Sequence, residues 1–291
     1  MVNSSLSEKL DLQFRTSAEN DQDRANAIFS GSVLVYRSMP AMHDLVECLR
    51  EITLREIALS DPCSAESVLG SIEFQHRAGS ARRIVRESED VARLYKKVLL
   101  EVGVDVSALF YDHFKLRFQP SDKASRSRYM RDLPAHRDTW GSNIHEQINW
   151  WAPISSISET NTMIFYPDYF SKAVKNSTST WDLNTYLEHR KREDFSYPSA
   201  PQLLEELPSD ANVQSVNIEP GEILCFSGCH LHSSSKKKSD NTRFSYEIRT
   251  ICQDDLDNRR EAPNTDCDLQ WQFPKIFRNI DDNSPLKLLA E

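Results

Sequence analysis

The sequence predicts one α+β domain in which a mainly helical N-terminal part precedes a core of short strands. Two observations support this prediction. Apolar residues recur at helical spacing at 42–59 and again at 85–102, whereas after Leu109 they fall in short runs, partly alternating with polar residues, as in strands. A helical part followed by many short strands favours an α+β fold built around a β-barrel or sandwich.

We expect residues 1–106 to form the helical part, residues 107–254 the strand core and residues 255–291 a C-terminal tail. A first short strand is expected at 32–36, and the strands of the core at 114–118, 148–154, 162–166, 213–218, 222–226 and 243–252. Pro220-Gly221 predicts a turn between two of these strands. A polar insert at 171–210, with a helix expected at 181–193, is long enough to serve as a lid over a binding site.

The composition narrows the class of protein. The chain has 291 residues and a net charge of −9, whereas a protein that binds nucleic acid backbones normally carries the opposite sign. It shows no signal-peptide pattern and no apolar run of the roughly 20 residues that a membrane span needs. The six cysteines form no CxxC pair, which favours reduced thiols. We therefore expect a cytoplasmic monomer or homodimer with a small-molecule substrate and neither nucleic acid nor membrane partners.

One candidate for a metal site is the pair His136 and Asp138, which follows the strand expected at 114–118. On an extended segment, residues two apart point to the same face, so both side chains could bind one ion. They would supply half of the two-histidine, one-carboxylate set of non-haem Fe(II) oxygenases. A single His-x-Asp is common by chance, and a histidine hydrogen-bonded to the neighbouring carboxylate is the alternative interpretation.

The second half of such a site follows nearly a hundred residues later. A turn at Pro220-Gly221 leads into the apolar run at 222–226, then to His232, and Arg243 comes eleven residues after this histidine. His230 is an alternative distal ligand, because it lies two residues before His232 and so possibly on the same face. Arg249 is the alternative to Arg243. The spacing favours His232 and Arg243.

Over residues 114–252 these segments resemble the phytanoyl-CoA dioxygenase-like group of Fe(II)/2-oxoglutarate-dependent oxygenases. The family pattern is His-x-Asp, a Gly-Asp-like turn, an apolar strand ending in Phe, a distal His and an Arg about eleven residues further on. Here the pattern is matched by His136 and Asp138, by Pro220-Gly221-Glu222, by His232 and by Arg243. The resemblance implies a double-stranded β-helix (jelly-roll or cupin-like) core, with the N-terminal helices packed on the larger sheet.

The resemblance also implies a function. His136, Asp138 and His232 would bind Fe(II), and 2-oxoglutarate would chelate the iron while Arg243 pairs with its distal carboxylate, because a guanidinium is a flat, two-pronged donor. The enzyme would consume O2, release succinate and CO2, and hydroxylate, desaturate or cyclise a small, polar, anionic metabolite. Asp138 argues against halogenation, since a small residue replaces this carboxylate in the halogenases of the superfamily.

Other residues are expected near this site. The candidates for the co-substrate are Ser234, Ser245, Trp151 and Gln147, and those for the substrate are Arg117, Arg128, Trp140 and Asn149. Arg128 belongs to a basic stretch at 123–131 that could bind an anionic group. Plain core packing and a solvated loop are the alternatives for the tryptophans and the basic stretch. For the whole chain, the alternatives are a metal-dependent cupin-type isomerase or hydrolase that needs no Arg243, and a non-catalytic ligand-binding relative.

Overall fold

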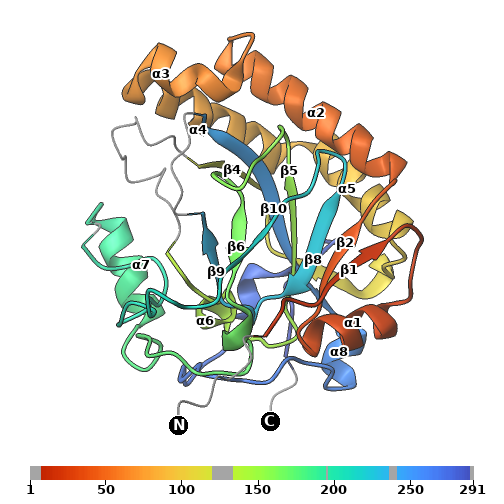
Figure 1. Cartoon of the computed structure of the whole chain (residues 1–291), viewed down its shortest axis with the longest axis vertical. Helices are drawn as coiled ribbons and strands as arrows, with labels where there is room; N and C mark the ends of the chain where they lie inside the picture. Colours follow the sequence, from red (N-terminus) through yellow and green to blue (C-terminus); the bar gives the residue numbers. More distant parts are fainter. Residues whose placement is uncertain (1–7, 120–133, 195, 236–240, 289–291) are drawn as a thin grey trace.

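The computed structural model describes residues 8–119, 134–194, 196–235 and 241–288, in which two β-sheets are covered by helices on one side (Figure 1). The helices are α1 (Asp21–Phe29), α2 (Pro40–Ile57), α3 (Ala65–Leu69), α4 (Ser71–Glu87), α5 (Glu89–Glu101), α6 (Thr139–Ser142), α7 (Leu183–Lys191) and α8 (Gln253–Asp257). None of these helices is both long enough and apolar enough to cross a lipid bilayer.

The long N-terminal helices begin and end at recognisable signals. Pro40 occupies the first turn of α2, and Ala58 ends the helix in the left-handed conformation with φ 56°. The side chain of Ser88 accepts a hydrogen bond from the backbone N–H of Val91 and so caps α5. This cap divides the segment predicted as one helix at 85–102, because α4 ends just before it. The helix predicted at 42–59 is confirmed as α2, which begins and ends two residues earlier than predicted.

The larger sheet contains eight strands of the described chain, in the order β1-β2-β8-β5-β10-β3-β11, and β4 also pairs with β10. Their bounds are Leu12–Arg15 (β1), Val33–Tyr36 (β2), Leu109–Tyr111 (β3), Lys115–Gln119 (β4), Ile148–Pro153 (β5), Ile223–Ser227 (β8), Arg243–Cys252 (β10) and Arg278–Asn279 (β11). All pairs are antiparallel except β1 with β2. The smaller sheet has the order β7-β6-β9, from Gln214–Val216, Met163–Phe165 and His232–Ser234.

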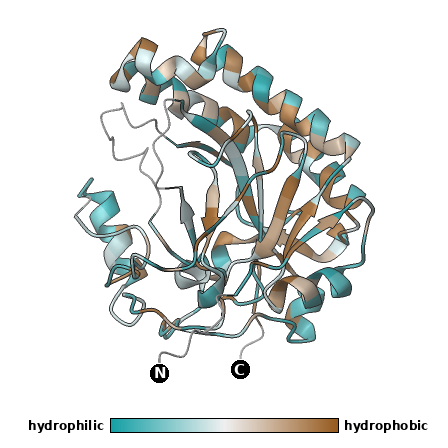
Figure 2. Ribbon diagram, viewed as in Figure 1, coloured by the Kyte–Doolittle hydropathy of each residue, from teal (hydrophilic) through white to brown (hydrophobic). Residues whose placement is uncertain are grey.

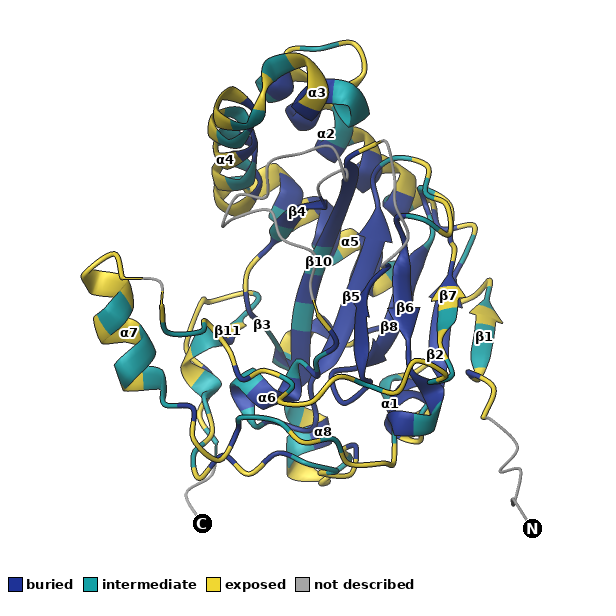
Figure 3. Cartoon of the chain, turned by 60° about the vertical axis from the view of Figure 1, so that its left-hand side comes forward, coloured by how far each residue is buried: buried dark blue, intermediate teal, exposed yellow. Residues whose placement is uncertain are grey.

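The two faces of the larger sheet bury different sets of side chains. One face packs against α2, α4 and α5, in a cluster that includes Tyr36, Trp150 and Ile248. The alternate residues of the same strands, among them Trp151 and Phe226, pack against apolar residues of the smaller sheet. Helices α2, α4 and α5 accordingly bury apolar residues on one side, and the central strands are buried along most of their length (Figures 2 and 3). The sheets thus form a sandwich with a helical outer layer.

Most predicted strands are confirmed within one or two residues. The strand predicted at 243–252 is β10 itself, and the turn at Pro220-Gly221 is present, with φ 102° at Gly221. A Cβ at Gly221 would lie 2.4 Å from Cε1 of His43, so this position needs glycine. Four short strands, β1, β3, β9 and β11, were not predicted. The helix expected in the insert is α7, and all six cysteines are free.

Candidate metal centre

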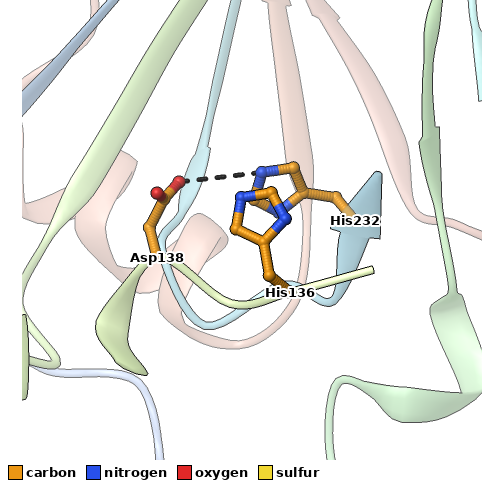
Figure 4. Close-up of side chains that lie close together, drawn as sticks. All are labelled: His136, Asp138 and His232. Carbon is orange, nitrogen blue, oxygen red and sulfur yellow. Dashed lines mark ion pairs between the residues drawn. The ribbon is translucent and has the colours of Figure 1, made fainter. Parts of the chain in front are cut away.

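Three side chains from two distant segments converge between the sheets: His136, Asp138 and His232 (Figure 4). His136 and His232 form an isolated antiparallel bridge, in which each backbone N–H donates to the other's carbonyl at 3.0 Å. The backbone N–H of Asp138 donates to the carbonyl of Gly228 at 2.9 Å. A Cβ at Gly228 would lie 2.7 Å from Nε2 of Gln147, so a larger residue there would displace this amide. Backbone contacts therefore hold the three residues together.

Both imidazoles are oriented by the backbone. Nδ1 of His136 lies 2.8 Å from the carbonyl oxygen of Pro134, and Nδ1 of His232 lies 2.9 Å from that of His230. A carbonyl oxygen can only accept, so each Nδ1 donates its proton, which leaves Nε2 as the ring atom that can face a metal ion. Nε2 of His232 lies 3.6 Å from Oδ2 of Asp138, and one ligand atom from each of the three residues lies within 4.8 Å of the others.

Asp138 does not continue an extended segment, as the sequence had suggested, but begins α6 with φ −68° and ψ −29°. Its Oδ2 accepts a hydrogen bond of 2.5 Å from Nδ2 of Asn149, and its Oδ1 lies 3.6 Å from Nη1 of Arg249. Burial alone would raise the pKa of this carboxyl, but His232, Arg249 and His136 outweigh it and hold the pKa below its usual range. The carboxylate is therefore ionised.

A buried acid supports Arg249 in turn. Oδ2 of Asp112 accepts from Nε of Arg249 at 2.6 Å and from Nζ of Lys115 at 2.5 Å. Burial alone would lower the pKa of Arg249, but Asp112 and Asp138 raise it above its usual value. Arg249 is thus fixed beside the candidate ligand Asp138, and it is not among the described residues that line the cavity containing Arg243. This position favours Arg243 over Arg249 as the group that meets a co-substrate.

The two neighbouring histidines differ in their surroundings. Burial, followed by the proximity of His136, lowers the pKa of His232 to about 4, so its imidazole is neutral at pH 7. His230 is buried too, but its Nε2 lies 3.0 Å from the backbone carbonyl oxygen of Gly31, and its ring lies against Phe165 and Phe170. Its Nδ1 lies 3.2 Å from the carbonyl oxygen of Ser227, so both ring nitrogens face backbone carbonyls, and His230 is not among the described residues that line the cavity of Asp138.

Arg243 lies in the wall of the same cavity. This side chain is 4% exposed, its Nη1 donates to the carbonyl of Asn161 at 2.9 Å, and its guanidinium carbon lies 5.4 Å from the centroid of the Trp151 ring. Together with the three candidate ligands, the cavity is lined by Arg117, Trp151, Met163, Ser233, Ser234, Arg243 and Glu247. The structure therefore brings Ser234, Trp151 and Arg117 to the cavity, as the sequence analysis expected.

Arg117 is not an isolated cation, however. Its Nε lies 2.7 Å from Oε2 of Glu247, and Nζ of Lys115 lies 4.0 Å from Oε1 of the same residue. Burial alone would raise the pKa of Glu247, but Arg117 and Lys115 lower it, so the pair is ionised. A substrate carboxylate would have to compete with Glu247 for Arg117, which weakens the expectation that this arginine alone recognises an anion.

Several expected site residues have other partners. Gln147 accepts from Oγ of Ser142 at 3.0 Å and donates to Oδ1 of Asn149 at 3.0 Å, and Asn149 donates to Asp138. These two amides therefore form a hydrogen-bonded chain that supports the candidate ligand Asp138. Contrary to the prediction, they are not among the described residues that line the cavity. Trp140 donates from Nε1 to Asp266 at 2.7 Å within a separate apolar cluster.

The remaining expected residues give mixed results. Oγ of Ser245 is buried and has no hydrogen-bond partner in the described chain, and the residue shares the inner face of β10 with Arg243. Arg128 and the whole basic stretch at 123–131 lie outside the described residues. No residue of the insert at 171–210 is among those that line the cavity, within the part of the chain that is described. Its role as a lid stays a prediction.

The sequence analysis missed residues that support the site. Arg243, Ser245, Glu247 and Arg249 occupy alternate positions on β10, and this two-residue period could have placed Glu247 in the cavity. The contribution of the tail had no local signal. Asp266 accepts from Nε of Arg137, the residue between two candidate ligands, whose Nη2 also donates to the carbonyls of Tyr169 and Lys172.

This donor set fits a transition metal. Two imidazoles and one ionised carboxylate form the facial ligand set associated with non-haem Fe(II), which leaves the opposite coordination positions open. The imidazole Nδ1 atoms and the carboxylate are each held by a further hydrogen bond, as is usual around bound metals.

Comparisons with known proteins add limited information. No family model matches the sequence, and no curated protein matches it. Similar solved structures include the epimerase SnoN in complex with Fe3+, alpha ketoglutarate and nogalamycin RO, at 13% identity and TM-score 0.44, covering 91% of this chain and 93% of that chain. Another is EctD from S. alaskensis with bound Fe, at 12% identity and TM-score 0.40, covering 91% and 85%.

A third is the nickel complex of the non-heme monooxygenase ThoJ, at 15% identity and TM-score 0.36, covering 72% of this chain and 69% of that chain. Because these identities and TM-scores are low, the function of the present chain has to be inferred from its own residues.

Proposed function

We propose that this protein is an Fe(II)- and 2-oxoglutarate-dependent oxygenase that acts on a small polar substrate. The observation that carries the proposal is the placement of His136, Asp138 and His232 in one cavity with the buried guanidinium of Arg243. A metal-dependent isomerase or hydrolase would use the three ligands but has no need of a buried arginine in the opposite wall. The arginine therefore favours the oxygenase over the other metal enzymes.

Each residue has a task in this proposal. His136 and His232 present Nε2 atoms to the iron, and Asp138 presents an ionised oxygen whose orientation Asn149 and Arg249 maintain. Bound iron, with O2 and 2-oxoglutarate, would supply the oxidation of a substrate C–H bond, with succinate and CO2 as co-products.

Arg243 would pair with the distal carboxylate of 2-oxoglutarate, because its planar donors match a carboxylate and it is held in place against Trp151. Ser234 and Ser245 are hydroxyl donors close by. The apolar side chains of Trp151 and Met163 in the same wall restrict water, which strengthens each polar contact.

The charges of the cavity fit the proposed ligands. Arg117 and Arg243 carry positive charges, and Asp138 and Glu247 carry negative ones, so the wall is neutral as a whole. A divalent metal ion brings a charge that the dianion 2-oxoglutarate balances. The cavity with metal and co-substrate is then neutral, as a buried site should be.

We place the protein in the phytanoyl-CoA dioxygenase-like group, on the spacing of the four segments that resemble it. In this assignment the two facing sheets are the halves of a double-stranded β-helix, and the chain is a single oxygenase domain that acts in the cytoplasm. Hydroxylation, desaturation and ring closure all remain within this chemistry. An anionic substrate is part of the proposal.

The test is an anaerobic titration of metal-free protein with Fe(II) and then with 2-oxoglutarate. We expect the weak visible charge-transfer band of a keto acid chelated to iron. The substitution His232→Ala should abolish the band, whereas the matched control His230→Ala should retain it, because both ring nitrogens of His230 face backbone carbonyls. Arg243→Gln should retain iron binding but weaken the affinity for 2-oxoglutarate by about 10-fold or more, the effect of losing a charge-assisted pair.

One result would refute the proposed oxygenase activity, and another would refute only the proposed ligand set. If the wild-type protein binds metal but shows no band with 2-oxoglutarate, the chain is a metal enzyme of another kind. If His230→Ala and His232→Ala exchange their effects, the ligand set is wrong even though the activity class stands.

A further inference from the structure

A second hollow lies on the other side of Arg117 from the metal cavity. Its lining residues come from α4 and from the segment that includes β4, a strand that pairs, among the described strands, only with β10 and lies beside α4 in Figure 3. Its volume is about 280 Å³, and the charged or titratable residues that line it are Arg82, Arg86, His113, Lys115 and Arg117. None of the described residues that line it is acidic.

The hollow continues into a neighbouring one of about 360 Å³. Arg86 and His113 line both, and the C-terminal segment adds Lys275 and Arg278. Asp112 also lines the second hollow, but its carboxylate is already paired with Lys115 and Arg249. We call these two hollows together the basic groove. Its cations come from α4, from residues 113–117 and from the C-terminal segment, in a chain whose net charge is −9.

These cations are close enough to disfavour one another. Burial, followed by the proximity of Arg117, lowers the pKa of Arg82 to about 10. Burial and Lys115 likewise lower the pKa of His113. The guanidinium of Arg82 lies 4.6 Å from the centroid of the Phe118 ring, and its Nε lies 3.3 Å from the carbonyl oxygen of Leu116, so its position is fixed. A bound anion would relieve the mutual repulsion without reorganising the groove.

The basic groove shares a wall with the metal cavity. Arg117 lines both, and its ion pair with Glu247 forms the boundary between them. The cavity with metal and 2-oxoglutarate is neutral by the balance described above, so it holds no surplus charge for an anionic substrate. Arg117 is counted in that balance with Glu247, and Nη2 of Arg86 lies 3.4 Å from Oε1 of Glu87. The remaining cations of the groove outnumber Asp112, the acidic residue among the described residues that line it.

We propose that the basic groove binds the phosphate or diphosphate group of a small-molecule substrate, whose reactive part extends past Arg117 to the metal. A single carboxylate would be satisfied by one guanidinium, whereas cations from three segments around two joined hollows suit a group with two or more negative charges. That the reactive part of the substrate is oxidised at the metal rests on the proposed oxygenase function. That the groove binds phosphate is independent of this function.

The probe is inorganic pyrophosphate, added to metal-free protein and measured by calorimetry, so that chelation of iron plays no part. We expect saturable binding that weakens as salt is added. The double variant Arg86→Gln/Lys275→Gln should weaken binding by about 10-fold or more, because charge-assisted contacts are lost. Both side chains are exposed, so the variant should fold; Arg82→Gln is the second, more buried test.

The matched control is Arg93→Gln/Lys175→Gln, which removes two exposed cations that pair with Asp90 and Glu205 elsewhere on the surface. It has the same net charge as the test variant and should bind pyrophosphate like the wild type. Inorganic phosphate and acetate should bind progressively more weakly than pyrophosphate.

Three outcomes would overturn the proposal: no saturable binding to the wild type, equal losses in test and control variants, or loss in Arg243→Gln with none in the groove variants. The last would place the anion in the metal cavity. The iron and 2-oxoglutarate band should survive in Arg86→Gln/Lys275→Gln. If the wild-type protein binds pyrophosphate but shows no band with Fe(II) and 2-oxoglutarate, the oxygenase assignment is refuted and the groove assignment stands.

Discussion

The two faces of β10 differ in composition and in role. Toward the helices it presents Phe244, Tyr246 and Ile248, which pack into the main apolar cluster. Toward the smaller sheet its alternate residues are Arg243, Ser245, Glu247 and Arg249, among which every charge has a counter-charge or a hydrogen bond. The outer face stabilises the fold, whereas the inner face maintains charged groups at a cost in stability.

The inner face of β10 lowers the stability of the fold, because charged groups lose their hydration when they are buried. A protein selected for stability alone would fill it with apolar residues. Arg249, held between Asp112 and Asp138, shows the compensation that makes the arrangement tolerable. The comparison teaches that buried polar networks, more than apolar clusters, mark where this molecule acts.

The largest effect is expected from Asp138→Ala on the inner face. Loss of a direct ligand should reduce the affinity for Fe(II) by more than the 10- to 100-fold that loss of a supporting residue typically costs. The melting temperature of the metal-free protein should fall modestly, because Arg249 and Asn149 each lose a partner while Arg249 keeps its ion pair with Asp112. Metal titration and thermal unfolding measure the two effects, with exposed Asp210→Ala as the control. An unchanged iron affinity would remove Asp138 from the ligand set.

A substitution on the outer face of β10 should change the stability of the fold and leave metal binding unchanged. Ile248→Ala removes a fully buried side chain and should lower the free energy of unfolding by about 2–5 kcal/mol. The metal affinity of the folded variant should match that of the wild type. Denaturant unfolding and metal titration test this, with Ile72→Ala, at a position that is 85% exposed, as the control. A large change in metal affinity would show that the two faces are coupled.

Glu146 is a buried carboxyl for which the described residues supply no cationic partner. Burial raises the pKa of Glu146 to about 7, so the folded state holds a proton that the unfolded state releases near pH 4.5. Stability from this group is therefore present below pH 4.5 and lost as the pH rises toward 7, up to about 3 kcal/mol. Glu146→Gln should stabilise the protein at pH 8 and flatten this dependence.

Unfolding measured from pH 4.5 to 8 tests the prediction, and the exposed Glu206→Gln is the matched control. If the two variants respond alike, Glu146 is not protonated in the folded protein.

The smallest effect is expected from Arg249→Gln. Removing this cation frees the carboxylate of Asp138 to rotate and should weaken iron binding by about 10- to 100-fold. Arg249→Lys should recover part of the loss, and the charge-transfer band should shift in the glutamine variant. Arg93→Gln is the control. If the lysine variant behaves like the glutamine variant, the geometry of the guanidinium matters more than its charge.

The sequence predicted the outer features of the fold better than the inner ones. Helix α2 and strand β10 follow from periodicity, and the segments that carry the three candidate ligands and Arg243 follow from spacing. The pairing of Asp112 with Arg249, 137 residues away, left no local pattern. Gln147 and Asn149 were expected at the cavity, because a sequence shows which residues are polar but not which partners they find.

The backbone bridge between His136 and His232 has a consequence for how the protein acquires its metal. These residues are 96 positions apart, and two backbone hydrogen bonds, which involve no ligand atom, join them directly. The folded chain thus offers a prepared site, unlike small domains that fold only when metal binds. Metal can then be exchanged after synthesis without unfolding, and the ion that occupies the site depends on cellular supply as well as on intrinsic affinity.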